Sequence, residues 1–99
     1  MNSTITFGKL LGDGRRNLGL SQKEFAQLLQ QHSVNIDYKH LSKIENNRLD
    51  IKAHIYDNLI DAVAEILVLN IDKLQQIRLT TEVEELDLSG AIFPVFYND

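Results

Sequence analysis

Apolar side chains recur three or four positions apart along most of this sequence, and this spacing most restricts what the chain can fold into. It extends from about residue 6 to residue 79, and it is typical of helices that bury one face. The helical segments lie near residues 6–17, 21–29, 37–46, 55–67 and 71–79. The sequence therefore predicts an all-α fold with five helices.

The length of the chain limits how these helices are organised. With 99 residues it is long enough for one domain with a modest core and too short for two. We expect a helical domain over residues 1–79 and a short acidic and apolar tail over residues 80–99. The tail is open to three readings, a short strand, an irregular arm or a short helix, and Pro94 disfavours a long helix.

Polar residues and one glycine mark where several predicted helices begin or end. Ser21 and Glu24 form a capping box, in which each side chain bonds to the backbone amide of the other residue. Asp37 and Asn70 are placed to cap the third and fifth helices. Gly19 follows the first helix, as glycines often do at helix ends.

The charge of the chain is unevenly distributed. The net charge is −4, which by itself argues against a nucleic-acid partner. However, residues 1–52 carry eight basic and five acidic side chains, whereas residues 80–99 carry five acidic and no basic ones. The asymmetry suggests separate surfaces for separate partners, and the small basic excess predicts modest, salt-sensitive affinity for DNA.

The motifs in segments 18–26 (LGLSQKEFA) and 38–48 (YKHLSKIENNR) resemble the phage-repressor and Cro-like family, the XRE-type helix-turn-helix proteins. The resemblance covers about residues 6–79. It implies a compact five-helix domain whose third helix, starting near Asp37, reads the major groove of double-stranded DNA. The residues agree with this implication, since Leu41 and Ile44 form one apolar face and polar residues occupy the others.

The resemblance also implies roles for individual residues. Base contacts come from the first turns of the third helix, here Tyr38, Lys39, Ser42 and Lys43, while His40 has no assigned role. Contacts to the DNA backbone come from the start of the second helix and the end of the third, here Ser21, Gln22, Lys23, Asn47 and Arg48. A structural ion pair is implied between Arg15 and Glu45, against the alternative of two separate surface charges.

One feature departs from the family. The stretch from Ala26 to Asp37 is about five residues longer than the family's usual turn. Residues 30–35 are predicted to form a polar connection, and Ile36 to fill the apolar slot before the third helix. The extra residues either extend the second helix or bulge outward.

The resemblance implies a sequence-specific transcriptional regulator, expected to repress by occupying an operator, and it includes the possibility of an antitoxin that regulates its own gene. The alternative is a protein-interaction module that keeps the fold but has lost DNA binding. Residues 82–97 combine acidic side chains with seven consecutive apolar residues, three of them aromatic. We expect this segment to pack on a partner chain, in a homodimer or a complex with another protein.

Several other classes of protein are disfavoured. The chain has no cysteine, and the spacing of its three histidines fits no zinc signature, so we expect no metal or other cofactor. No arrangement of nucleophile and base predicts an enzyme. The chain shows no signal peptide, and its longest uninterrupted apolar runs are too short to span a bilayer, so we expect a cytoplasmic protein without a membrane partner.

Overall fold

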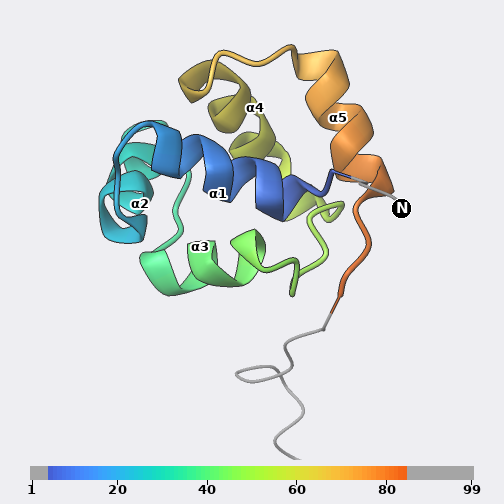
Figure 1. Ribbon diagram of the computed structural model, residues 1–99, viewed down its shortest axis with the longest axis horizontal. Coiled ribbons are helices and arrows are strands. Elements are labelled where there is room, and N and C mark those ends of the chain that lie inside the picture. Colours follow the sequence, from blue (N-terminus) through green and yellow to red (C-terminus); the bar gives the residue numbers. More distant parts are fainter. Residues whose placement is uncertain (1–4, 85–99) are drawn as a thin grey trace, which may run out of the picture.

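The computed structural model describes residues 5–84, and these residues form helices and connections without any strand (Figure 1). The helices are α1 (Phe7–Asn17), α2 (Gln22–Gln31), α3 (Tyr38–Glu45), a single 3₁₀ turn η1 (His54–Tyr56), α4 (Asp57–Ile66) and α5 (Ile71–Thr80). The predicted all-α fold with five α-helices is therefore confirmed. Of the predicted partner-binding segment 82–97, only residues 82–84 lie within the described part of the chain.

Short-range hydrogen bonds start the helices where the sequence indicates. The Ser21 hydroxyl accepts from the Glu24 amide at 3.1 Å, and the Glu24 carboxylate accepts from the Ser21 amide at 2.8 Å, which completes the capping box. The side chains of Asp37 and Asn70 likewise accept from amides in the first turns of α3 and α5. Gly19 has a φ of 74°, a left-handed conformation that glycine adopts at little cost, and it ends α1.

The core lies between one face of each helix. α1 crosses the molecule between α3 on one side and α4 with α5 on the other (Figure 1). The side chains that are less than 2% exposed come from all five α-helices, namely Phe7, Leu11, Phe25, Leu29, Leu41, Ile44, Leu59, Ile60, Val63 and Leu74. Burial of these apolar faces is the main stabilising contribution to a fold of this kind.

A close approach between α1 and the end of α3 explains one of the glycines. A Cβ atom at Gly8 would lie 2.6 Å from the carbonyl oxygens of both Ile44 and Glu45. Only a residue without a side chain allows the two helices to come this near. The approach brings α1 directly against the end of the helix that the sequence analysis assigns to DNA.

The connection between α2 and α3 decides between the two alternatives for the longer turn. α2 continues to Gln31, so it includes the first residues of the expected polar connection. The remaining residues do not bulge outward, because Val34 and Ile36 are buried, with 6% and 7% of their surfaces exposed. The prediction that Ile36 fills an apolar slot is confirmed, whereas the predicted connection over residues 30–35 begins two residues later, because Gln30 and Gln31 belong to α2.

The start of the fourth helix also differs from the prediction. The periodicity places Ile55 on its buried face, but Ile55 lies in η1 and is 76% exposed. The buried guanidinium of Arg78 donates hydrogen bonds to the carbonyls of Ile51 and Ala53, at 2.7 and 2.9 Å, and to the Asp57 carboxylate at 2.7 Å. This anchor from α5 holds the chain before α4, where local spacing alone predicts a continuous helix.

Within residues 5–84, no helix has both the length and the apolar character needed to cross a bilayer.

Candidate nucleic-acid interface

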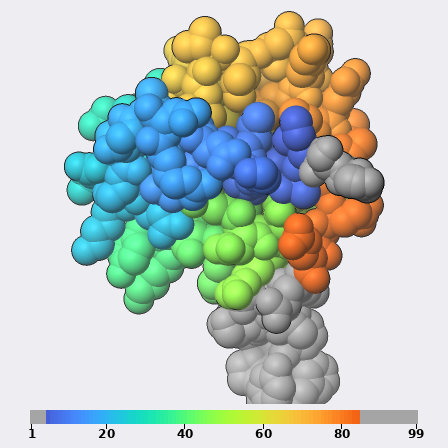
Figure 2. Space-filling model, viewed as in Figure 1, coloured from blue at the N-terminus to red at the C-terminus, as the bar shows by residue number. Residues whose placement is uncertain are grey.

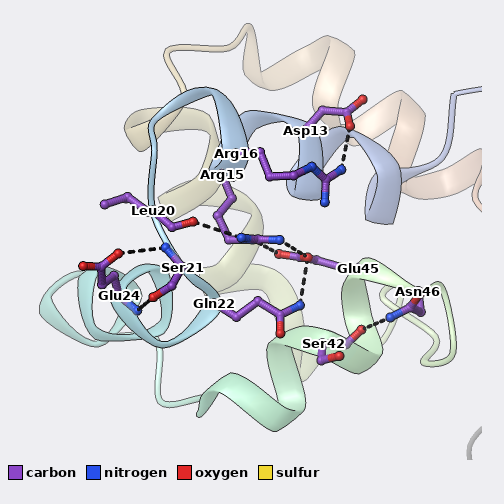
Figure 3. A network of polar contacts seen from close by, with 10 residues as sticks. All are labelled: Asp13, Arg15, Arg16, Leu20, Ser21, Gln22, Glu24, Ser42, Glu45 and Asn46. Carbon is purple, nitrogen blue, oxygen red and sulfur yellow. Dashed lines mark hydrogen bonds and ion pairs between the residues drawn. The ribbon is translucent and has the colours of Figure 1, made fainter.

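α2 and α3 pack against each other, and a buried ion pair joins α3 to α1 (Figure 3). The Arg15 guanidinium donates from Nε to Glu45 Oε2 at 2.8 Å and from Nη2 to Glu45 Oε1 at 3.1 Å. The side chains are only 11% and 7% exposed, respectively. The ion pair implied by the resemblance is therefore present, and the alternative of two separate surface charges does not hold.

Two further contacts extend this ion pair to the start of α2. Arg15 Nη1 donates to the carbonyl of Leu20 at 2.9 Å, and Gln22 Nε2 donates to Glu45 Oε1 at 3.1 Å (Figure 3). Glu45 thus receives bonds from both α1 and α2 while it belongs to α3. The network fixes the beginning of α2 relative to the end of α3, which sets the geometry of any surface that the two helices share.

The exposed side of α3 carries the residues assigned to base contacts. Leu41 and Ile44 are buried on the opposite side, as predicted. Tyr38 is 38% exposed and Lys39 is exposed, whereas Ser42 and Lys43 are half-buried. These side chains provide hydroxyl and ammonium groups, which can bond to base edges.

Lys23 of α2 lies beside this surface. Its ammonium nitrogen is 5.1 Å from the centre of the Tyr38 ring, a favourable cation–π geometry. The contact joins a residue assigned to phosphate with a residue assigned to bases. The two sets of predicted contacts therefore lie on adjoining parts of one surface.

The start of α2 has backbone amides available to an anion. The capping box uses the amides of Ser21 and Glu24, and the Ser21 side chain is occupied in the same way. No acceptor within residues 5–84 bonds to the amides of Gln22 and Lys23. Because the helix dipole also favours negative charge here, this end of α2 suits a phosphate group.

Asn47 corrects one of the predicted backbone contacts. Its side chain is only 7% exposed, and its φ of 56° turns the chain sharply after α3. Oδ1 accepts from the Gly8 amide at 3.0 Å, and Nδ2 donates to Thr6 Oγ1 at 2.9 Å and to Glu84 Oε2 at 3.3 Å. The side chain is therefore used to attach the end of α3 to α1, and it does not face a DNA phosphate. Arg48, the next residue, is exposed.

His40 has a structural contact that the sequence analysis missed. Its Nε2 atom lies 2.7 Å from the Tyr56 hydroxyl, and the two rings meet edge to face with centres 5.6 Å apart. Burial is the main factor that lowers the pKa of His40 below 6.5. His40 thus joins α3 to η1, and the helical spacing of the sequence gave no signal for this partner.

The beginning of the acidic tail lies at the C-terminal end of α3. Thr81 Oγ1 accepts from the Phe7 amide at 2.8 Å, and the Thr81 carbonyl accepts from Lys52 Nζ at 3.3 Å. The Glu84 amide donates to the Asn47 carbonyl at 2.9 Å. The Glu84 carboxylate is therefore held next to the edge of the α3 surface.

Residues 5–84 contain no cluster of three potential metal-ligating side chains. Comparison of the chain with protein-family models, with curated proteins and with solved structures finds no match. The likeness to the phage-repressor and Cro-like family accordingly rests on the sequence motifs alone.

Proposed function

We propose that this protein is a sequence-specific DNA-binding transcriptional regulator, and that α3 reads the major groove. The observation that carries the proposal is one continuous surface, formed by the exposed side of α3 and the start of α2. Tyr38, Lys39, Ser42 and Lys43 contact bases in this proposal, and Lys23 with the free amides of α2 contacts the DNA backbone.

The internal contacts of the domain support this assignment. Base reading requires a helix held in a constant orientation while its outer side remains accessible. The Arg15–Glu45 ion pair and the Gln22 bond hold α3 against α1 and α2 from within. Repression by occupying an operator, as a dimer on two half-sites, is the mode that we propose. An antitoxin that represses its own gene would act through the same surface.

The test is selection of binding sites from a random duplex library at low salt. We expect the wild-type protein to enrich a consensus, and a palindromic consensus would support binding as a dimer. The double variant Lys39→Ala/Lys43→Ala should lose it, because each lost base contact costs about 1–3 kcal/mol. Lys73→Ala is the matched control, since Lys73 is exposed in the first turn of α5, outside α2 and α3.

The variants must retain the helical far-ultraviolet spectrum of the wild-type protein for the comparison to be valid. A consensus recovered by wild type and Lys73→Ala but absent in the double variant supports the proposal. No enrichment by the folded wild-type protein contradicts it.

A second candidate function is a protein-interaction module that has lost DNA binding. The placement of Glu84 beside Asn47 favours it, because this carboxylate repels phosphate at the edge of the α3 surface. The double variant Glu82→Gln/Glu84→Gln separates the two functions. A DNA reader that the acidic residues merely weaken should gain enrichment in this variant, whereas an interaction module should enrich nothing before or after the change.

A further inference from the structure

A groove lined mainly by apolar side chains lies between α1 and the connection from α4 to α5, which are neighbours in Figure 2. Its volume is about 540 Å³, within the range of pockets that hold a ligand. No residue of α2 or α3 lines it. The apolar side chains that form most of its wall are Ile5, Leu10, Leu18, Leu67, Val68 and Leu69.

The groove leaves apolar side chains in contact with water. Ile5 is 54% exposed, Leu18 is 49% exposed and Val68 is 88% exposed. Val68 also has a φ of 55°, which is strained for a β-branched residue. Apolar patches of this kind on a small domain usually receive another apolar group.

The chain itself contains a segment of matching chemistry. Residues 91–97 have the sequence AIFPVFY, and they lie outside the described residues 5–84. Residues 1–4, which directly precede Ile5, have the sequence MNST and are mostly polar. Of residues 1–4 and 85–99, only the second stretch contains a run of apolar side chains that matches the groove.

The described chain stops close to one end of the groove. Glu84 and Thr6 both bond to the side-chain amide of Asn47, so these two residues lie within a few ångströms of the same group. Thr6 directly follows Ile5, which lines the groove. Residue 84 is therefore near the Ile5 end of the groove but on the α3 side of α1, so the connecting segment has to pass around the start of α1.

The length of the connecting segment is sufficient. Residues 85–90 separate Glu84 from the apolar segment, and six extended residues span about 20 Å. The groove follows α1, whose 11 residues are about 16 Å long. Lys9 also lines the groove, where its ammonium group is paired with the Asp13 carboxylate at 3.0 Å.

We propose that residues 91–97 dock in the groove between α1 and the α4–α5 connection of the same chain, in place of the partner chain that the sequence alone predicts for this segment. A short connection makes docking within one molecule equivalent to a partner at a millimolar concentration, which favours the chain's own segment over that of a second copy. This inference does not depend on DNA binding, and its test contains no DNA.

The test uses the full chain and a fluorescent reporter at Phe96. The sequence contains no tryptophan, so Phe96→Trp provides a single signal from the segment. We expect emission at shorter wavelength and a lower acrylamide quenching constant than for a free peptide of residues 85–99 with the same substitution. Light scattering on the same samples identifies the concentrations at which the protein is a monomer, and the reporter is measured there.

Two groove variants and one control locate the docking site. Leu18→Glu places a charge in the groove. Val68→Asn removes an apolar side chain from it, and asparagine tolerates the positive φ at this position. Each should shift the emission to longer wavelength and raise the quenching constant. Ile55→Glu changes an exposed aliphatic residue outside the groove and should leave both signals unchanged.

The possible outcomes divide clearly. Protection in the monomer that is lost in both groove variants and kept in Ile55→Glu supports the proposal. It is overturned if the reporter is as accessible as in the peptide, or if the groove variants leave its protection intact. Protection that appears only in a dimer and falls on dilution also overturns it, since a second copy would then supply the segment.

Discussion

At the scale of single residues, the contact between Arg15 and Glu45 is the most informative feature of the molecule. Arg15 and Glu45 form a bidentate pair with buried side chains. The side chains of the Lys9–Asp13 pair, which lies within α1, are 68% and 46% exposed. Removing one partner of a buried pair leaves an uncompensated charge, and water screens an exposed pair. The two pairs should therefore differ greatly in their contribution to stability.

We predict that Glu45→Ala lowers the free energy of unfolding by about 3–5 kcal/mol, because it leaves the Arg15 guanidinium buried without its carboxylate. Urea unfolding followed by circular dichroism measures this change. Lys9→Ala is the control and should have little effect. Equal effects of the two substitutions would show that burial does not distinguish the pairs in solution.

At the scale of helices, α3 packs against α2 and has two further junctions, one with α1 and one with η1. Gly8 allows α1 to approach the last carbonyls of α3, and the contact between His40 and Tyr56 joins the first half of α3 to η1. Neither junction lies on the proposed DNA surface. Both nevertheless determine where that surface is presented.

Gly8→Ala is expected to destabilise the protein by about 1–3 kcal/mol, although alanine favours helices, because the new methyl group would overlap backbone atoms at the end of α3. Thermal or urea unfolding measures the effect. Gly12→Ala is the matched control one turn later, where the nearest atoms belong to the flexible Arg16 side chain. It should be neutral or stabilising. A stabilised Gly8→Ala variant would be incompatible with the close approach of α1 and α3.

The His40 junction predicts a dependence of stability on pH. Burial lowers the pKa of His40 in the folded protein below 6.5, so the unfolded chain binds this proton more tightly. This contribution to stability is present above pH 6.5 and is lost as the pH falls from there toward the lower pKa of the folded state.

Urea unfolding of the wild-type protein and of His40→Gln at a series of pH values tests this prediction. The glutamine variant keeps a polar side chain near Tyr56 but cannot titrate, so its stability should change less between pH 7 and the acidic range. His54→Gln is the control, because His54 is exposed. Parallel pH profiles for wild type and His40→Gln would contradict the assignment.

At the scale of the whole molecule, charge is divided between surfaces. The start of α2 and the outer side of α3 carry Lys23, Lys39 and Lys43, whereas Glu84 brings a carboxylate to the adjoining edge. In the proposed function, the binding of DNA is therefore a balance between phosphate attraction and carboxylate repulsion. Such a balance appears directly in the dependence of affinity on salt.

We predict that Lys23→Ala weakens binding to all duplexes and reduces the slope of log affinity against log salt by about one, as the loss of one phosphate contact requires. Fluorescence anisotropy at several salt concentrations measures the slope. Lys73→Ala on α5 should leave the slope unchanged. An unaltered slope in Lys23→Ala would exclude this lysine from the phosphate contacts.

The local elements of this protein follow from short stretches of its sequence. Helix starts at Ser21, Asp37 and Asn70 were predictable because a cap forms between residues two or three positions apart. The buried faces, including Leu41 and Ile44, were predictable because helical periodicity places them on one side. The Arg15–Glu45 pair came from the family resemblance, and the roles assigned to the DNA surface remain predictions.

Contacts between residues distant in sequence became clear from the three-dimensional arrangement of the helices. Asn47 was predicted to face DNA, but its side chain accepts from the amide of Gly8, 39 positions away. Arg78 donates to the carbonyl of Ile51, 27 positions before it, and so holds the chain that leads into α4. His40 contacts Tyr56, which is also distant in the sequence, and the groove lies between α1 and the α4–α5 connection. Such contacts depend on how the helices are arranged in space, and helical spacing within one segment carries no information about that arrangement.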